Sequence, residues 1–327
     1  MADCASDDEM ELQTSIILRA NVIFMSTLAI LTFYLSYKAF MILKVGSIFH
    51  SSTRILLFTG LGFVNFHELA FFYLQIITIY RSFTLSERPC EIMRTTKECR
   101  AQNHSLIFGL AGITFTQSAL SLERLIATII PEKYSKLKKW PGIVLSIIAI
   151  LCSLSAPFII VWNDPFEDTV PNCFFFPAQS RFRANVFLMT LTGFVFFSIF
   201  LNLIIISVNK SSELSTRFLV EQRYQKREAL ISTRIVCYIA IAQFFALAFY
   251  SCSVLALRLM KDQIPRAYYH NIVWWAYTVP FAAVALPALL IYRINQSGRW
   301  RKKVINKITN MTETQEEHME SLKQLWG

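Results

Sequence analysis

Charged residues are scarce in this chain of 327 residues: Asp, Glu, Lys and Arg make up only 17%, whereas hydrophobic residues make up 54%. The mean hydropathy is +0.43, and one soluble core could not bury that much apolar surface. The apolar residues form seven runs, each near or above the roughly 20 residues that cross a hydrocarbon core as a helix. These predicted spans are about 20–43, 55–80, 105–130, 141–162, 184–208, 234–258 and 270–293. The sequence therefore predicts an all-α membrane protein, a bundle of seven transmembrane helices without a separate globular domain.

The sequence also lacks the residue patterns of an enzyme. It contains no glycine-rich nucleotide loop, no nucleophile elbow and no pair of catalytic carboxylates. Of the five histidines, only His67 lies deep in a span and His270 lies at a span edge, so the ligand set of a membrane zinc hydrolase does not assemble. We therefore expect no catalysis, no cofactor and no metal.

Basic residues are absent from the first 18 residues, whereas the loops after the first, third and fifth spans and the tail hold most of the Lys and Arg. This bias predicts an extracellular N-terminus at 1–19, a membrane domain at 20–293 and a cytoplasmic tail at 294–327. After Gly298, apolar and basic residues recur at helical spacing and predict a short amphipathic helix on the inner leaflet. The net charge of +10 follows from the same asymmetry and favours contact with anionic membrane lipids over nucleic acid.

Two adjacent charged residues, Glu123 and Arg124, lie at the end of the third span, where burial of charge is costly. With seven spans, the leading interpretation is a receptor switch that couples an outside ligand to an inside partner. Cys99 lies 25 residues before Arg124, which as a helix is about 37 Å, or one bilayer and an interface. If Arg124 lies at the inner surface, Cys99 faces the outer loop that holds Cys173. The spacing therefore predicts a disulfide between these two cysteines.

Two further features fall on the predicted outer side. Cys4 and Cys90 form either a second disulfide or two free thiols. Asn103-His-Ser is the only outward glycosylation sequon, and it lies directly beside the third span.

His67 and Glu68 stand near the middle of the second span. One interpretation is a polar switch pocket shared with the third and seventh helices. The other is a protonated Glu68 that joins two helices through a hydrogen bond. Because adjacent residues on a helix point about 100° apart, we expect the two side chains to serve different faces.

Five other side chains are candidates for a ligand pocket. Gln117 lies in the third span, and the aromatic candidates in the outer halves of their spans are Tyr73, Trp274, Trp275 and Tyr277. Aromatic residues at that depth also form interface belts, and a buried glutamine also joins helices, so both interpretations stay open.

The acid–Arg pair, the cysteine before it and the cysteine of the second outer loop resemble the pattern of G-protein-coupled receptors. More narrowly, Cys-Ala-Ser at 4–6, Leu-Gln-Thr-Ser at 12–15, Glu-Arg-Leu-Ile-Ala-Thr at 123–128 and the short tail resemble the nematode serpentine chemoreceptors of the Sra family. The sister families Srab and Sre are alternatives. The resemblance implies a chemosensory receptor for a small environmental or pheromone-like ligand. It also implies coupling to a heterotrimeric G protein in a plasma membrane, that of sensory-neuron cilia.

The sequence departs from the rhodopsin-like pattern in three places. Leu125 stands where a tyrosine usually follows the arginine, the sixth span has no proline, and the seventh ends in Pro287-Ala-Leu-Leu-Ile-Tyr292. The resemblance therefore implies the architecture without the detailed switch geometry. Two other functions compete: a seven-span ligand-gated channel, whose inside N-terminus would contradict the Lys and Arg distribution, and a non-sensory receptor for a neuropeptide or transmitter.

Overall fold

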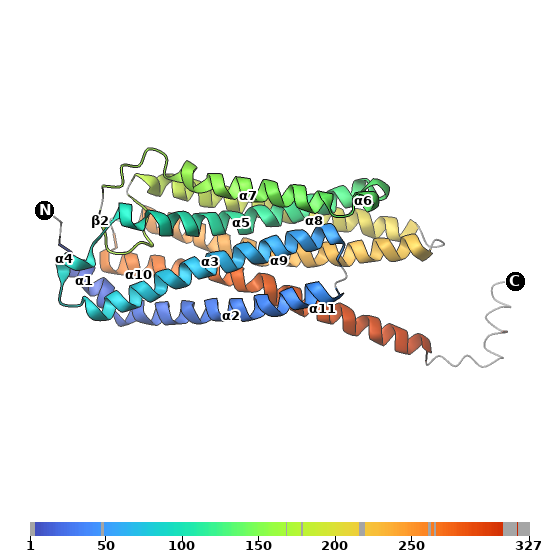
Figure 1. Cartoon of the computed structure of the whole chain (residues 1–327), viewed down its shortest axis with the longest axis horizontal. Helices are drawn as coiled ribbons and strands as arrows, with labels where there is room; N and C mark the ends of the chain where they lie inside the picture. Colours follow the sequence, from blue (N-terminus) through green and yellow to red (C-terminus); the bar gives the residue numbers. More distant parts are fainter. Residues whose placement is uncertain are drawn as a thin grey trace.

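The computed structural model describes residues 4–46, 49–167, 169–177, 179–215, 220–260, 263–264, 266–309 and 319. Within these residues, seven helical segments are long and apolar enough to cross a membrane. They confirm the predicted fold class, an all-α bundle of seven helices that lie side by side along one long axis (Figure 1).

Six of the spans are single helices: α2 (Ile16–Gly46), α3 (Ser51–Thr84), α5 (Thr96–Ile129), α7 (Trp140–Ile160), α8 (Ser180–Ser215) and α9 (Val220–Leu259). The seventh comprises α10 (Arg266–Ala276) and α11 (Val279–Thr309). The short elements are α1 (Asp7–Thr14), α4 (Pro89–Ile92), α6 (Pro131–Leu137), β1 (Arg94–Thr95) and β2 (Thr169–Val170). β1 and β2 pair antiparallel, with Arg94 opposite Val170.

The two ends of the bundle differ. The N-terminal helix α1, the short helix α4, β2 and α10 gather at one end, which we call the cap end, and α6 lies at the other (Figure 1). The helix at the centre is α5, whose most apolar 18-residue window is 72% buried, against 28% for that of α8. A residue on α5 therefore reaches neighbours on several helices, which makes this helix the natural place for a shared site.

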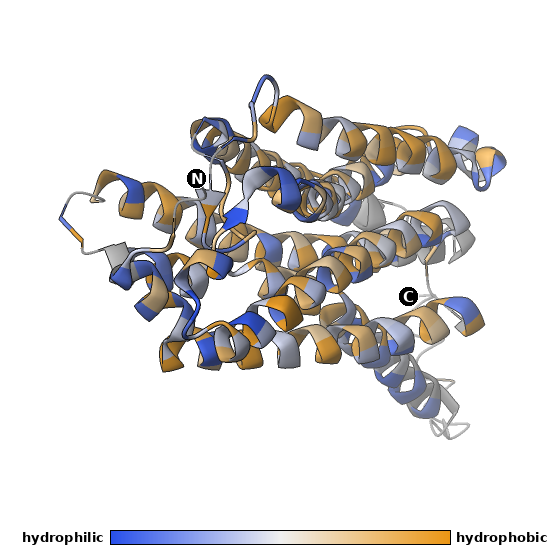
Figure 2. Cartoon of the chain, turned by 60° about the vertical axis from the view of Figure 1, so that its left-hand side comes forward, coloured by the Kyte–Doolittle hydropathy of each residue, from blue (hydrophilic) through white to orange (hydrophobic). Residues whose placement is uncertain are grey.

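The surfaces of the outer helices are apolar. Large residues such as Phe196, Phe197 and Phe200 of α8 are each more than half exposed. Hydrophobic residues run along the helices, and hydrophilic ones are frequent in the loops and near helix ends (Figure 2). Apolar patches of this extent are rare on soluble monomers, and the hydrocarbon of a bilayer would cover them.

The seventh span is not the continuous helix that the sequence predicted over 270–293. It breaks at Tyr277 and Thr278, between the end of α10 and the start of α11. Pro280 explains the break, because its ring would clash with the carbonyl of Ala276, four residues earlier, and it has no N–H to bond that carbonyl. The hydroxyl of Thr278 donates to the carbonyl of Ala246 on α9, at 2.6 Å, and this hydrogen bond joins the break to that helix.

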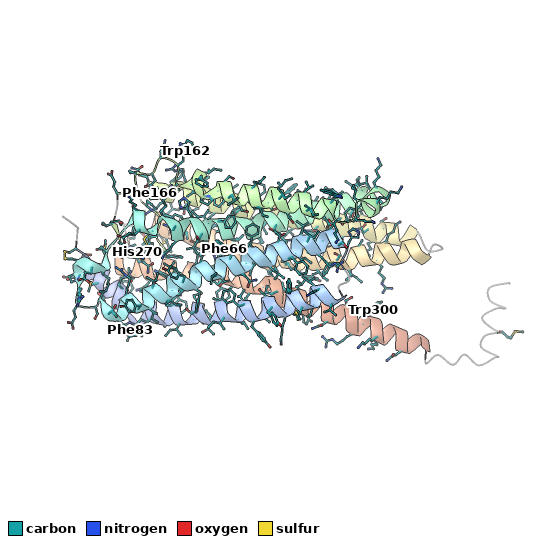
Figure 3. The ribbon with its side chains drawn as sticks, in the orientation of Figure 1. Phe66, Phe83, Trp162, Phe166, His270 and Trp300 are labelled. Atoms are coloured by element: carbon teal, nitrogen blue, oxygen red, sulfur yellow. A yellow bond between two sulfur atoms is a disulfide. The ribbon has the colours of Figure 1, made fainter. Side chains whose placement is uncertain are left out.

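The separate amphipathic helix expected after Gly298 is absent from the described residues, because α11 continues through Gly298 to Thr309. A glycine within a helix costs only about 1 kcal/mol relative to alanine, so it does not by itself end the helix. Trp300 lies on this extension, at the end opposite His270 (Figure 3). The guanidinium of Arg227 on α9 stands 4.2 Å from the centre of its ring. The extension is therefore tied to α9 by a cation–π contact.

Glycine lets α3 and α5 approach closely. A Cβ atom added at Gly109 would lie 2.7 Å from the Cβ and 2.9 Å from the Cα of His67. We expect Gly109→Ala to push the helices apart and to lower the free energy of unfolding by about 1–3 kcal/mol. The midpoint of thermal unfolding in detergent would measure the loss. Gly62→Ala on α3 is the matched control, since its added Cβ meets nothing within 4 Å. A Gly109→Ala protein as stable as Gly62→Ala would contradict the close approach.

Candidate functional site

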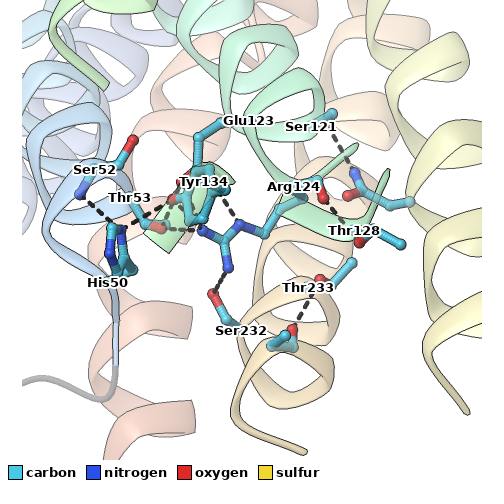
Figure 4. Close-up of polar contacts among 12 residues, drawn as sticks. His50, Ser52, Thr53, Ser121, Glu123, Arg124, Thr128, Tyr134, Ser232 and Thr233 are labelled. Carbon is cyan, nitrogen blue, oxygen red and sulfur yellow. Dashed lines mark hydrogen bonds and ion pairs between the residues drawn. The ribbon is translucent and has the colours of Figure 1, made fainter. Parts of the chain in front are cut away.

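A buried ion pair lies where four elements meet, at the end of the bundle away from the cap. Arg124 donates from Nε to Glu123 Oε2 and from Nη2 to Glu123 Oε1, both at 2.6 Å (Figure 4). Both residues are on α5, Glu123 is fully buried, and Arg124 is only 4% exposed. The planar guanidinium matches the two carboxylate oxygens, which makes the pair stronger than a single hydrogen bond.

Hydrogen bonds extend this pair to three other elements. Thr53 of α3 donates to Glu123 Oε1 at 3.1 Å and accepts from Arg124 Nη2. The hydroxyl of Tyr134 on α6 donates to the same carboxylate oxygen. Arg124 Nη1 donates to Ser232 Oγ of α9 at 3.2 Å. We call Thr53, Glu123, Arg124, Tyr134 and Ser232 the Arg124 cluster. Because its members come from α3, α5, α6 and α9, the cluster holds these elements together at one end of the bundle.

His50, just before α3, supports the cluster from the side. Its Nδ1 lies 3.1 Å from the Tyr134 hydroxyl and accepts from the N–H of Ser52 at 3.4 Å. Burial lowers the pKa of His50 and outweighs the nearby Glu123 charge, which raises it, while the Arg124 charge lowers it further. Burial also raises the pKa of Tyr134, and the charge of Glu123 adds to that effect. At neutral pH we therefore expect an uncharged imidazole and a protonated phenol that can donate to Glu123.

Sequence reasoning identified Glu123 and Arg124 but missed Thr53, Tyr134, Ser232 and His50. Thr53, Tyr134 and Ser232 lie 71, 10 and 108 residues from Arg124 along the chain, so no local pattern joins them to it. The available signal was depth in the membrane, because residues at the start of the second and sixth spans lie at the same depth as residues at the end of the third span.

A second polar group lies deeper in the bundle. His67 and Glu68 of α3 are fully buried. His67 Nδ1 lies 3.0 Å from Glu68 Oε1, and His67 Nε2 lies 2.7 Å from the hydroxyl of Tyr277 at the break in the seventh span. The expectation that the two neighbours serve different faces is wrong, because the imidazole reaches both the carboxylate and the tyrosine. Glu68 Oε2 has no hydrogen-bond partner among the residues that the structure describes.

A cavity of about 40 Å³ lies toward the cap end, between α5, α7, α8 and α9. Leu106, Leu110 and Ile160 are among its apolar lining residues, and Phe174 and Phe176 of the segment after β2 also line it. Its polar lining residues are Asn103, Tyr250 and Tyr277. Tyr277 therefore belongs to the cavity wall and also bonds His67, which connects the two polar regions.

The ligand-pocket candidates from the sequence fall into residues at the cavity and residues away from it. Tyr277 lines the cavity, and Trp274 stacks on its wall residue Phe174 with ring centres 4.4 Å apart. Tyr73 and Trp275 are 57% and 44% exposed and do not line this cavity, a position that suits the bilayer belt better than the pocket. Gln117 donates to the carbonyl of Val236 on α9 at 3.1 Å and is absent from the lining, so it joins helices.

The glycosylation candidate Asn103 is buried in the cavity wall, with 2% of its surface exposed. A glycan is bulky and needs an exposed side chain, so this position disfavours use of the sequon. The burial of the side chain needs another explanation.

Two disulfides close the cap end. Cys99 of α5 is bonded to Cys173, and Cys4 is bonded to Cys90, the two pairs that the sequence analysis considered. The first bridge holds the segment with Phe174 over the cavity. The helix α1 follows Cys4 in the chain, and its Gln13 donates to the carbonyl of Pro171, two residues before Cys173, at 3.1 Å. The N-terminal segment thus packs on the bundle as a structured cap.

We expect Cys99→Ser and Cys173→Ser each to lower surface expression. Loss of a native disulfide typically costs about 2–5 kcal/mol. The double variant should be no worse than either single variant, because one bond is lost in all three. Flow cytometry of an extracellular epitope tag would measure this, with Cys152→Ser, which removes an exposed free thiol, as the control. Additive losses would contradict a shared bond.

Comparison with known proteins gives one consistent result. The sequence model of the family described as "Serpentine type 7TM GPCR chemoreceptor Sra" matches residues 1–326. "Serpentine receptor class alpha-10" of Caenorhabditis briggsae is 62% identical over 324 residues, which is 99% of this chain and 98% of that protein. The protein of the same name in Caenorhabditis elegans is 62% identical over 326 residues, 99% of this chain and 97% of its own length. "Serpentine receptor class alpha-6" of C. elegans is 33% identical over 324 residues, 99% of this chain and 98% of that protein.

Proposed function

Because this chain belongs to the Sra family of serpentine seven-transmembrane chemoreceptors, we propose that it binds a small environmental or pheromone-like ligand and activates a heterotrimeric G protein. It does so as a multi-pass protein of the plasma membrane, in the cilia of sensory neurons. The cap end with residues 1–19 faces outward, and the Arg124 cluster and residues 294–327 face the cytoplasm.

The Arg124 cluster is the observation that carries this proposal. A buried bidentate ion pair that bonds residues of α3, α6 and α9 restrains the ends of these elements. Such a pair contributes little net stability compared with apolar packing, because desolvation offsets the attraction. A switch explains it better, since opening the cluster would free Arg124 and expose a cleft to the G protein.

The two polar regions suggest how a ligand acts on that cluster. A molecule in the cavity contacts Tyr277, and Tyr277 bonds His67, which in turn bonds Glu68. Tyr277 lies at the break of the seventh span, where its N–H donates to the carbonyl of Trp274, three residues earlier, at 3.3 Å instead of continuing the α-helix. A ligand that binds one position of Tyr277 more tightly than another therefore shifts the population of the receptor states.

Nucleotide exchange on purified heterotrimeric G proteins tests the proposal directly. Membranes from cells that express the chain would be screened with volatile and water-soluble cues, with membranes from untransfected cells as the control. We expect a cue-dependent rise in exchange.

An epitope tag at position 2 should be reachable by antibody on intact cells, and a tag after Gly327 only after permeabilisation. A non-hydrolysable GDP analogue blocks G proteins, so a cue-evoked current that persists in its presence would support the channel function instead. Nucleotide exchange driven only by peptides or transmitters would support a non-sensory receptor.

A further inference from the structure

We propose that the cavity beside Asn103 binds a small, uncharged and mainly apolar molecule that donates a hydrogen bond to Asn103 Oδ1. The inference rests on the proposed receptor function and adds to it the chemical class of the ligand and the residue that selects it.

The first step concerns the burial and hydrogen bonding of the Asn103 side chain. This residue lines the cavity near the cap end of α5, together with Leu106 and Ile107, which lie three and four residues further along the helix. Side chains at these spacings share one helix face, so the amide lies on the face that forms the wall. Its Oδ1 is buried and has no hydrogen-bond partner among the described residues. A buried acceptor without a partner costs about 1–3 kcal/mol, and a ligand that donates to it removes this cost.

The second step is the charge of the ligand. Of the described residues that line the cavity, none is charged, and all but Asn103 are apolar or aromatic. A charged molecule that entered would lose its hydration without gaining a counter-ion, which is strongly unfavourable. Amino acids and amines in their ionised forms are therefore excluded, whereas an uncharged molecule with one hydroxyl group is suited to this lining.

The third step distinguishes a donor from an acceptor. The hydroxyl of Tyr277 already bonds His67 Nε2 at 2.7 Å, whereas Asn103 Oδ1 is an open acceptor. A molecule with an O–H or N–H group can satisfy it, and a molecule with only an ether or carbonyl oxygen cannot.

The fourth step is size. The free volume is about 40 Å³, and Phe174 and Phe176 belong to the segment that the Cys99–Cys173 bridge holds in place. A short aliphatic alcohol fits this volume, whereas an aromatic ring, a peptide or a steroid would require the lining to move, since a cavity that admits benzene measures about 150 Å³.

Photoaffinity labelling of the purified full chain in phospholipid nanodiscs tests the proposal without a G protein. Three probes share one short aliphatic diazirine skeleton and differ only in the head group: an alcohol, its methyl ether and a primary amine, which is charged at neutral pH. Mass spectrometry of the peptides would locate the label. We expect the alcohol to label peptides with Leu106–Leu110 or Phe174–Phe176 roughly three- to tenfold more than the ether does, as one hydrogen bond predicts. The amine should label them least.

Two variants sharpen the test. In Asn103→Leu, which keeps the approximate size of the side chain without the acceptor, the alcohol and the ether should label equally. Gln243→Leu is the matched control, because it removes a buried amide of α9 that has no described partner and is not part of the cavity lining. It should keep the difference between the probes. Ala184→Leu adds volume within the lining and should reduce labelling by both neutral probes.

Several results would overturn the proposal: equal labelling of the unmodified chain by alcohol and ether, equal labelling by the amine, label confined to peptides outside the lining, or a preference for the alcohol that survives in Asn103→Leu. If Asn103→Leu does not fold, the comparison of the three probes on the unmodified chain and on Ala184→Leu still decides. Labelling as expected without any cue-dependent nucleotide exchange would support the site and reject the receptor function. Cue-dependent nucleotide exchange without the expected labelling would reject the site alone.

Discussion

Arg124→Ala is expected to abolish cue-dependent nucleotide exchange on the G protein. The substitution removes the side chain that bonds Glu123, Thr53 and Ser232 in the resting cluster and that we propose meets the partner after opening. Exchange would be measured at equal surface expression, with Arg54→Ala as the control, because Arg54 lies on the same end of α3 and bonds Ser51. Normal exchange in Arg124→Ala would remove the main support for the proposed function.

A second variant separates signalling from folding. Removing one partner of a buried ion pair leaves an unpaired charge and typically costs about 3–5 kcal/mol, so Arg124→Ala is also expected to lower the amount of folded receptor. The double variant Glu123→Gln/Arg124→Ala removes both charges. It should regain surface expression without regaining exchange.

Glu123→Gln alone is expected to raise cue-independent exchange. The carboxylate accepts from Arg124, Thr53 and Tyr134, so the substitution weakens the contacts that hold four elements together. Hydrogen bonds to charged groups contribute about 1.5–3 kcal/mol each, which corresponds to roughly tenfold or more in the ratio of resting to active states. Basal exchange without any cue would measure the shift. A basal rate equal to that of the unmodified chain would contradict a restraining role for Glu123.

Glu68→Gln is expected to bias the receptor strongly toward one state, as Glu68→Ala should. We infer a charged, switching role for this carboxylate, which His67 bonds on one side and no described residue bonds on the other. A glutamine keeps the shape but not the charge. Dose–response curves of both variants would be compared at equal surface expression. Gln75→Leu, a buried amide seven residues further along α3, is the control and should give a curve close to that of the unmodified chain.

An unchanged curve for Glu68→Gln would show that Glu68 acts as a neutral hydrogen-bond donor, which is the structural alternative. Tyr277→Phe then gives independent information, because it keeps the ring that packs on Phe71 and Phe174 and removes only the bond to His67. A lower response in Tyr277→Phe with a normal one in Glu68→Gln would place the switch at the break of the seventh span.

The break itself could have been read from the sequence. Pro280 removes the hydrogen bond to Ala276 by covalent structure alone, so a discontinuity two or three residues before it is a local consequence. At Gly298 the outcome differs, because the sequence predicted a short amphipathic helix after this residue and α11 continues through it instead. A proline is a steric constraint, whereas one glycine is a small energetic term that neighbouring residues outweigh.

The sequence by itself determined the seven spans, because length and hydropathy are local properties and every backbone group in lipid must be satisfied within its own helix. It also determined which cysteine faces Cys173, since a fixed rise per residue converts 25 residues into a depth. Only the tertiary structure decided which face each helix turns inward. That rotation buried Asn103 in a cavity wall, turned Tyr73 and Trp275 outward, and brought Thr53, Tyr134 and Ser232 to Arg124. The physical reason is that a bilayer covers apolar residues on any face, so packing between helices fixes the rotation and the sequence pattern does not.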